Sequence, residues 1–168
     1  MALQELGAVR ESLTINVVSV STRAATGVYE DRTGPPMVET LRAMGHVVAD
    51  PVVVADGEPL AEALTALLAE SPDVIITSGG TGLTPKDLTP EVTRRFLDRE
   101  IPGVAEALRL DGRSRGVDTA ALSRGVCGVA GNTLVVNLPG SMGGARDGVA
   151  VLAPLLTHAV DQIAGGDH

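Results

Sequence analysis

The chain has 168 residues, enough for one domain with a substantial hydrophobic core, and its net charge at pH 7 is −8. Such an acidic chain lacks the positive surface that binds nucleic acids or anionic membranes. The only aromatic residues, Tyr29 and Phe96, offer few surfaces on which bases could stack. We therefore expect neither a nucleic-acid partner nor a membrane contact.

The ends of the chain and its cysteine content indicate a simple organisation. Residues 1–12 are expected to form a short N-terminal extension, followed by one domain over residues 13–165. No apolar run is long enough to span a membrane, and the N-terminus lacks the apolar stretch of a signal peptide. The single cysteine, Cys127, cannot form an internal disulfide, which is compatible with the cytoplasm. We expect Cys127 to be a small packed residue.

Strands and helices alternate along the first half of the chain. Leu13 to Val20 is rich in β-branched residues, which predicts a strand buried on both faces. After a loop that contains glycine, Pro35 and Pro36 suit the first turn of a helix. Val47 to Val54 predicts an edge strand, or two short pieces, because Pro51 interrupts it. An amphipathic helix follows; its apolar face carries Leu60, Leu64, Leu67 and Leu68.

The second half continues this alternation and adds a hairpin. Asp73 to Thr77 predicts a third buried strand, and Thr89 is the expected N-cap of a helix that starts at Pro90. Residues 102–109 are expected to be helical. Residues 121–138 contain two β-rich pieces around a glycine-containing turn, which predicts a hairpin.

The last helix has two apolar sides. Its main face carries Val149, Leu152, Leu156, Val160 and Ile163. A second stripe, Val151 and Leu155, lies on the other side, so one side of this helix is a candidate subunit interface. Together the elements predict an α/β fold, a three-layer sandwich with a mostly parallel sheet and a small β-hairpin.

The loop Ser78-Gly79-Gly80-Thr81-Gly82, directly after the third strand, is the main candidate for a ligand site. In open α/β sheets, ligands bind beyond the carboxyl ends of the strands. Glycines allow positive φ, so that successive backbone N–H groups can converge on a phosphate, and the two hydroxyls add donors. A turn that needs glycine for its geometry alone is the alternative. The combination of glycines, hydroxyls and a strand end favours phosphate binding over that alternative.

Two aspartates and one turn are expected at the same edge of the sheet as this loop. Alone, Asp56 is explained as the N-cap of the Leu60 helix and Asp87 as a turn residue. Two carboxylates beside a polyphosphate are also a common Mg²⁺ site. The turn Pro139-Gly140-Ser141 precedes the last helix, which Ser141 can cap. The geometry of a turn and a helix cap is enough to explain every residue of this segment, without a ligand.

Taken together, these residues resemble the molybdopterin-binding family of molybdenum cofactor biosynthesis. The family includes bacterial Mog and MoaB proteins and the G domains of gephyrin and of its plant counterpart. The block from Gly79 to Glu91 is the most specific match. The matching segments are 19–29, 31–35, 77–91, 122–124, 125–131 and 137–141.

The resemblance implies a molybdopterin-binding-domain fold that assembles as a homotrimer, and a nucleotidyl transfer. A molybdopterin adenylyltransferase transfers AMP from ATP to the terminal phosphate of molybdopterin, releases pyrophosphate and uses Mg²⁺. The two essential aspartates of the family fall on Asp56 and Asp87. These would act in catalysis and hold the metal ion.

The resemblance also assigns the two sides of the site. The loop from Ser78 to Gly82 would hold phosphate, while Ser123, Arg124 and the turn Pro139-Gly140-Ser141 would line the pterin side. The nucleotide-side candidates are Ser19, Ser21 and Thr22. Thr22 departs from the family, because many relatives have an aspartate there. A MoaB-like protein that binds molybdopterin or a related pterin without catalysis is therefore the alternative, and a third is other phosphate-ester chemistry on this fold.

Overall fold

The computed structural model describes residues 10–166. The expected N-terminal extension lies mostly outside the described residues, apart from Arg10, Glu11 and Ser12, which are exposed. In chain order the elements are β1 (Thr14–Val20), α1 (Thr22–Ala25), α2 (Gly34–Ala43), β2 (Val47–Val48), β3 (Val52–Val54), α3 (Glu58–Ala69), β4 (Val74–Ser78), α4 (Thr89–Arg94), β5 (Arg99–Glu100), α5 (Pro102–Ser114), the short 3-10 helix η1 (Asp118–Leu122), β6 (Cys127–Ala130), β7 (Thr133–Leu138) and α6 (Met142–Ile163).

One mixed sheet forms the middle layer of the molecule. Its strand order is β2-β1-β4-β7-β6-β5, and β3 also pairs with β1. Strands β1, β2, β3, β4 and β7 are parallel, whereas β6 runs antiparallel to both β7 and β5. Strands β4 and β7 are buried along their whole length, as expected for strands that are covered on both faces.

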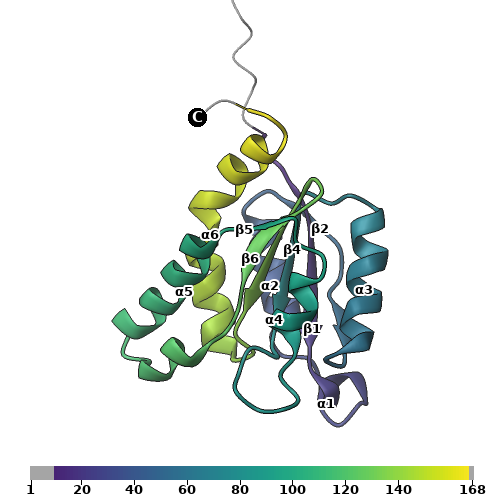
Figure 1. Cartoon of the computed structure of the whole chain (residues 1–168), viewed down its shortest axis with the longest axis vertical. Coiled ribbons are helices and arrows are strands. Elements are labelled where there is room, and N and C mark those ends of the chain that lie inside the picture. Colours follow the sequence, from purple (N-terminus) through teal and green to yellow (C-terminus); the bar gives the residue numbers. More distant parts are fainter. Residues whose placement is uncertain (1–9, 167–168) are drawn as a thin grey trace, which may run out of the picture.

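Helices cover both faces of this sheet. Helices α2, α5 and α6 pack on one face, and α3 and α4 pack on the other, so that α3 and α6 lie on opposite sides of the sheet in Figure 1. The apolar residues of α6 that contact the sheet recur at helical spacing, as the sequence predicted. The expected three-layer α/β fold with a mostly parallel sheet is therefore confirmed.

Several finer expectations are also confirmed. Pro51 separates β2 from β3, which form two short pieces along β1 at the edge of the sheet. Strands β6 and β7 form the predicted hairpin, with Gly131 in its turn at φ +59. Cys127 is buried in the core, and burial raises the pKa of its thiol to about 12. A thiol with so high a pKa stays protonated near neutral pH, so Cys127 is a packing residue.

Other elements were not predicted from the sequence, and one expectation was wrong. The sequence did not predict α1, β5 or η1, which are short, and α5 continues beyond residue 109 to Ser114. Thr89 is not the N-cap of α4: Leu88 occupies that position without a side-chain cap. The Thr89 hydroxyl donates to Asp56 instead, so a contact distant in sequence replaces the local cap. No helix among residues 10–166 is both long enough and apolar enough to cross a membrane.

Candidate active site

The carboxyl ends of four parallel strands meet at one edge of the sheet. The paired residues there are Ser19 with Ser78, Val20 with Val54, and Ser78 with Leu138. The residues that continue these strands are therefore neighbours in space, and they include Asp56, the glycine loop and the turn at Pro139. Most of the residues that the sequence singled out come together at this edge.

The glycine loop offers unused backbone donors. Gly79 and Gly80 have φ angles of +109 and +66, which a residue with a side chain rarely adopts. The Gly79 amide donates to Leu138 O at 3.0 Å, and the Ser78 hydroxyl donates to Pro139 O at 2.8 Å. Both groups therefore hold the neighbouring turn. The amides of Gly80, Thr81 and Gly82 meet no acceptor within residues 10–166, and three successive free N–H groups can bind an anion.

Each of the two predicted aspartates lies against one glycine of this loop. A methyl group on Gly80 would overlap Asp56 Oδ2 and the Thr89 hydroxyl. A methyl group on Gly82 would lie 2.8 Å from Asp87 Oδ2. The two carboxylates therefore flank the loop, and the missing side chains of the glycines leave room for them.

Asp56 is held by donors from two helix starts. Its Oδ1 accepts from the Gly57 amide at 2.8 Å and from the Thr89 hydroxyl at 3.2 Å, and its Oδ2 accepts from the Leu88 amide at 2.9 Å. The N-cap of α3 is Gly57, with no side-chain cap. The N-cap role that the sequence offered for Asp56 is thus wrong, because its carboxylate turns toward α4.

The carboxylate of Asp87 is held by a residue of its own turn. Its Oδ2 accepts from the Thr84 amide at 3.0 Å and from the Thr84 hydroxyl at 2.8 Å, as in a turn closed by an aspartate. Its Oδ1 meets no donor among the described residues. Neither Asp56 nor Asp87 forms an ion pair within residues 10–166. Both carboxylates are half-buried and keep lone pairs for a further ligand.

The donor set fits a Mg²⁺ ion that is shared with a ligand. In the described part of the chain, no cluster of three or more His, Cys, Asp or Glu residues is suited to a metal ion. The protein would therefore contribute two carboxylates at most. Mg²⁺ commonly binds in this way, through one or two carboxylates, waters and the phosphates of a substrate.

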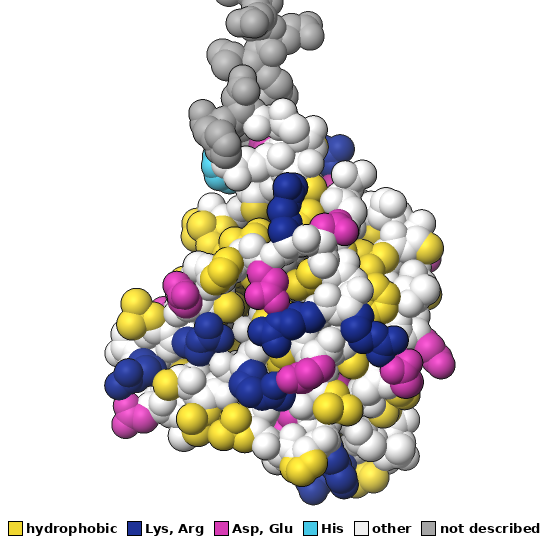
Figure 2. Space-filling view, in the orientation of Figure 1, with side chains coloured by type: hydrophobic (Ala, Val, Ile, Leu, Met, Phe, Trp, Pro, Cys, Tyr) yellow, Lys and Arg dark blue, Asp and Glu magenta, His cyan; other side chains and the backbone are white. Residues whose placement is uncertain are grey.

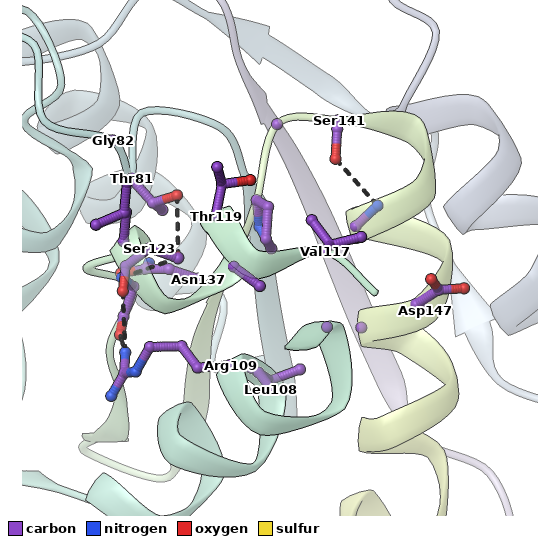
Figure 3. A pocket seen from close by; sticks show the side chains of 18 of the residues that line it. Thr81, Gly82, Leu108, Arg109, Val117, Thr119, Ser123, Asn137, Ser141 and Asp147 are labelled. Atoms are coloured by element: carbon purple, nitrogen blue, oxygen red, sulfur yellow. Dashed lines mark hydrogen bonds between the residues drawn. The ribbon is translucent and has the colours of Figure 1, made fainter. Parts of the chain in front are cut away.

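A cavity of about 1010 Å³ opens beside the loop, between η1 and α5 on one side and the start of α6 on the other. Gly80, Thr81, Gly82 and Asp87 line it, but Asp56 does not, so the loop separates the cavity from Asp56. In Figure 3, the Ser141 hydroxyl caps α6, where it accepts from the Gly144 amide at 3.1 Å. The expected cap is confirmed, and the positive end of α6 lies at the cavity wall.

The residues expected on the pterin side have different positions. Ser123 lines the cavity, and its hydroxyl donates to Thr81 Oγ1 at 3.3 Å (Figure 3). The turn from Pro139 to Ser141 also lines it. Arg124 does not: its guanidinium donates to Gly82 O, Asp87 O and Glu91.

The nucleotide-side candidates lie at the end of β1. The buried Ser19 hydroxyl donates to Asp31 Oδ2 at 2.6 Å. The Ser21 hydroxyl accepts from the Ala24 amide and pairs with the Tyr29 hydroxyl, and both contacts stabilise the entry to α1. Thr22 is exposed in the first turn of α1, and its side chain makes no hydrogen bond within residues 10–166.

The sequence missed the far wall of the cavity. The sequence gave no role to several residues of α5, η1, α6 and the connection before η1 that Figure 3 shows around the opening: Leu108, Arg109, Val117, Thr119 and Asp147. The only local signal was the run of small residues at the start of α6. A methyl group on Gly148 would lie 2.7 Å from the side chain of Leu138, so this run lets α6 approach the sheet closely.

Known proteins share both the sequence and the fold of this chain. A family model described as "Probable molybdopterin binding domain" matches residues 16–158. The molybdopterin biosynthesis Mog protein from Mycobacterium ulcerans has a structure that superposes with a TM-score of 0.84, is 52% identical, and covers 90% of this chain and 99% of its own. The molybdopterin adenylyltransferase of Helicobacter pylori strain J99 is 33% identical over 162 residues, which are 92% of this chain and 90% of that protein.

A longer relative matches through one part of its length. The molybdenum cofactor biosynthesis bifunctional protein of Synechococcus elongatus is 39% identical over 153 residues, which are 90% of this chain and 48% of that protein. The chain thus spans about half the length of that relative. Because the family model covers most of the chain and close relatives agree over nearly all of it, the chain belongs to the molybdopterin-binding domain family of Mog and MoaB proteins, and its role lies in molybdenum cofactor biosynthesis.

Proposed function

We propose that this protein is a Mg²⁺-dependent molybdopterin adenylyltransferase, which transfers AMP from ATP to the terminal phosphate of molybdopterin and releases pyrophosphate. The glycine loop is the observation that carries the proposal. Three free amides, from Gly80 to Gly82, lie between two carboxylates, Asp56 and Asp87, that form no ion pair in the described part of the chain. This arrangement suits phosphate groups and a divalent cation together.

The chemistry needs positioning and charge neutralisation rather than a covalent nucleophile. A terminal phosphate oxygen of molybdopterin attacks the α-phosphorus of ATP, a new P–O bond forms, and the bond between the α-phosphorus and the bridging oxygen breaks. Pyrophosphate leaves with that electron pair. Mg²⁺ held by Asp56 and Asp87 would neutralise phosphate charge. The free amides of Gly80, Thr81 and Gly82 hold and orient a phosphate between the two substrates.

The glycine loop divides the proposed site into a pterin side and a nucleotide side. The cavity beside Asp87 takes the pterin, with Ser123 and the turn Pro139-Gly140-Ser141 at its wall. The nucleotide approaches from the side of Asp56 and the end of β1, which the loop separates from the cavity. The Ser19 and Ser21 hydroxyls are engaged within the protein, so Thr22 is the hydroxyl there that remains free to bind.

The same proposal includes the assembly and the compartment of the protein. We expect a cytoplasmic homotrimer, and the outer side of α6 is the candidate interface. Leu155 on that side is 40% exposed and Val151 is only partly buried, so this apolar stripe is available for a contact between subunits. Sedimentation equilibrium or light scattering would measure the number of subunits.

The test is AMP transfer to molybdopterin with and without Mg²⁺. We expect Asp56→Asn and Asp87→Asn each to lower turnover by about 100-fold or more, because each removes a charge next to the phosphates. Asp50→Asn is the matched control, because the Asp50 side chain is 92% exposed and pairs with Arg42. It should leave the rate unchanged.

Each outcome has a clear meaning. Full activity in either Asp56→Asn or Asp87→Asn would contradict the role of the two carboxylates. If the unmodified protein binds molybdopterin tightly but transfers no AMP, the alternative of a MoaB-like binding protein is favoured, and the free Thr22 becomes the first position to examine.

A further inference from the structure

We infer that Arg124 and Glu91 form a clamp that fixes the segment Gly82–Asp87, and through it the carboxylate of Asp87, without touching the substrate. The part of this inference that concerns catalysis rests on the proposed function. The part that concerns the segment itself does not, because it follows from contacts within the protein.

One guanidinium joins the two ends of the segment. Arg124 Nε donates to Gly82 O at 2.8 Å, and its Nη2 donates to Asp87 O at 2.8 Å. The Arg124 amide also donates to Thr81 O at 2.9 Å. A single side chain from the connection between η1 and β6 thus sets the distance between the glycine loop and Asp87.

Glu91 completes the clamp from α4. Its carboxylate accepts from Arg124 Nη1, and its second oxygen lies 3.5 Å from Nη2. This hydrogen bond lowers the pKa of Glu91, so the carboxylate stays ionised and paired near neutral pH. Figure 2 shows one face of the molecule, on which Arg and Lys side chains lie among Asp and Glu side chains. Exposed pairs of this kind usually contribute little on their own.

The bonds to backbone carbonyls distinguish Arg124 from the two arginines at the end of α4. Arg94 and Arg95 pair with Glu100 and Glu58, and neither forms another side-chain hydrogen bond in the described part of the chain. By contrast, every guanidinium nitrogen of Arg124 already has an acceptor in the protein, and Arg124 does not line the cavity. Arg124 therefore acts within the protein, through two bonds to the segment and one to Glu91, and outside the wall of the cavity.

The segment has little else to hold it. Leu83, Thr84, Pro85 and Lys86 are exposed, and the internal bonds run between Thr84 and Asp87. Without the clamp, this turn would move as a unit, and Asp87 would move with it. An error of about 1 Å in the position of a catalytic group can lower a rate by about 100-fold.

Arg124→Lys is the variant that tests the clamp. Lysine keeps the charge, but a single ammonium cannot bridge two carbonyls and a carboxylate as the planar guanidinium does. We expect the two hydrogen-bonded amides of the segment, those of Thr84 and Asp87, to exchange hydrogen about tenfold faster or more in the free, full-length protein. Arg95→Lys is the matched control, because it loosens an exposed pair between α3 and α4 and should leave this segment unchanged.

The second readout is kinetic. We expect Arg124→Lys to lower kcat for AMP transfer by about tenfold or more and to change KM for molybdopterin by less than about threefold. This is the pattern expected of a residue that positions a catalytic group. A residue that contacts the pterin would instead raise KM. Glu91→Gln removes the charge of the carboxylate but leaves Arg124 bound to the two carbonyls, so it should act in the same direction and more weakly.

The exchange measurement does not depend on the reaction. Unchanged exchange of the Thr84 and Asp87 amides in Arg124→Lys would overturn the clamp, whatever happens to activity. Faster exchange together with no AMP transfer by the unmodified protein would support the clamp and contradict the proposed function. If Arg124→Lys unfolds as a whole, Glu91→Gln is measured in its place, and exchange of the Thr84 and Asp87 amides no faster than in Arg95→Lys would overturn the role of Glu91 in the clamp.

Discussion

The two aspartates that flank the glycine loop have the same chemistry but different supports. Asp56 receives bonds from Gly57, the N-cap of α3, and from the start of α4, and one of its donors, Thr89, is fully buried. Asp87 belongs to an exposed turn, and its carboxylate is held by Thr84 within the same turn. The first is anchored by the core, and the second depends on Arg124, a side chain from another part of the chain.

This difference shows how one site can combine a fixed group and an adjustable one. The Asp56 side is built before any ligand arrives, because helix starts and buried groups define it. The Asp87 side belongs to a short exposed segment, whose position depends on bonds from Arg124. The two sides should therefore respond differently to matched substitutions.

The largest contrast is expected between the two glycines that touch these carboxylates. Gly80→Ala places a methyl group on Asp56 Oδ2 and on the buried Thr89 hydroxyl, at a φ of +66. We expect a loss of about 1–2 kcal/mol of unfolding free energy from the backbone alone, and more from the overlap. Gly82→Ala meets Asp87 Oδ2 at 2.8 Å, at the flexible end of a side chain, and should cost less than about 1 kcal/mol.

Denaturant unfolding measures this contrast, and Gly45→Ala isolates the backbone contribution. Gly45 has a φ of +94, and a methyl group there would have no heavy atom within 4 Å. Gly80→Ala should therefore be less stable than Gly45→Ala. Equal losses in Gly80→Ala and Gly82→Ala would mean that the Asp56 side is as adjustable as the Asp87 side.

Much of the fold could be predicted because β-branched runs and helical spacing are local signals. That the candidate site residues lie together could also be predicted, since parallel strands end at one edge and glycine, hydroxyl and carboxylate residues follow three of them. The residues that hold Asp56 and Asp87 in place could not be predicted. Arg124 bonds to residues 33 to 42 positions away, and no local pattern specifies such pairs. For Thr89, the helix-start pattern predicted an N-cap. In the structure its hydroxyl donates instead to the carboxylate of Asp56, which follows a different strand.

A smaller contrast is expected for the two hydroxyls that bind the carboxylates. Thr89→Val removes a donor to Asp56 at a site with no exposure, and we expect a loss of about 1–2 kcal/mol of unfolding free energy. Thr84→Val removes the corresponding donor to Asp87 in an exposed turn, where water replaces it, so the loss should stay below about 0.5 kcal/mol. Thermal unfolding of both variants checks this. A greater loss in Thr84→Val than in Thr89→Val would reverse the assignment of the fixed and adjustable sides.

The smallest contrast concerns charge, because only the Asp87 side is held through an ion pair in the described part of the chain. Arg124 lowers the pKa of Glu91 from its ordinary value of 4.5. A group whose pKa is lower in the folded state stabilises that state above its ordinary pKa. This stabilisation is lost as the pH falls through the lower, folded value. Since the Glu91 side chain is 51% exposed, the contribution should be less than about 1 kcal/mol.

The unfolding free energies of the unmodified protein and of Glu91→Gln, measured as a function of pH, test this sign. The unmodified protein should be the more stable one by a constant amount between about pH 6 and pH 8, and the difference should shrink as the solution becomes more acidic than the ordinary pKa of Glu91. High salt should shrink it as well, because half-exposed charges are screened. A difference that grows toward acid would mean that Glu91 is stabilised in its protonated form. The ion pair would then contribute nothing, and the Asp87 side would be held by the bonds from Arg124 to the two backbone carbonyls alone.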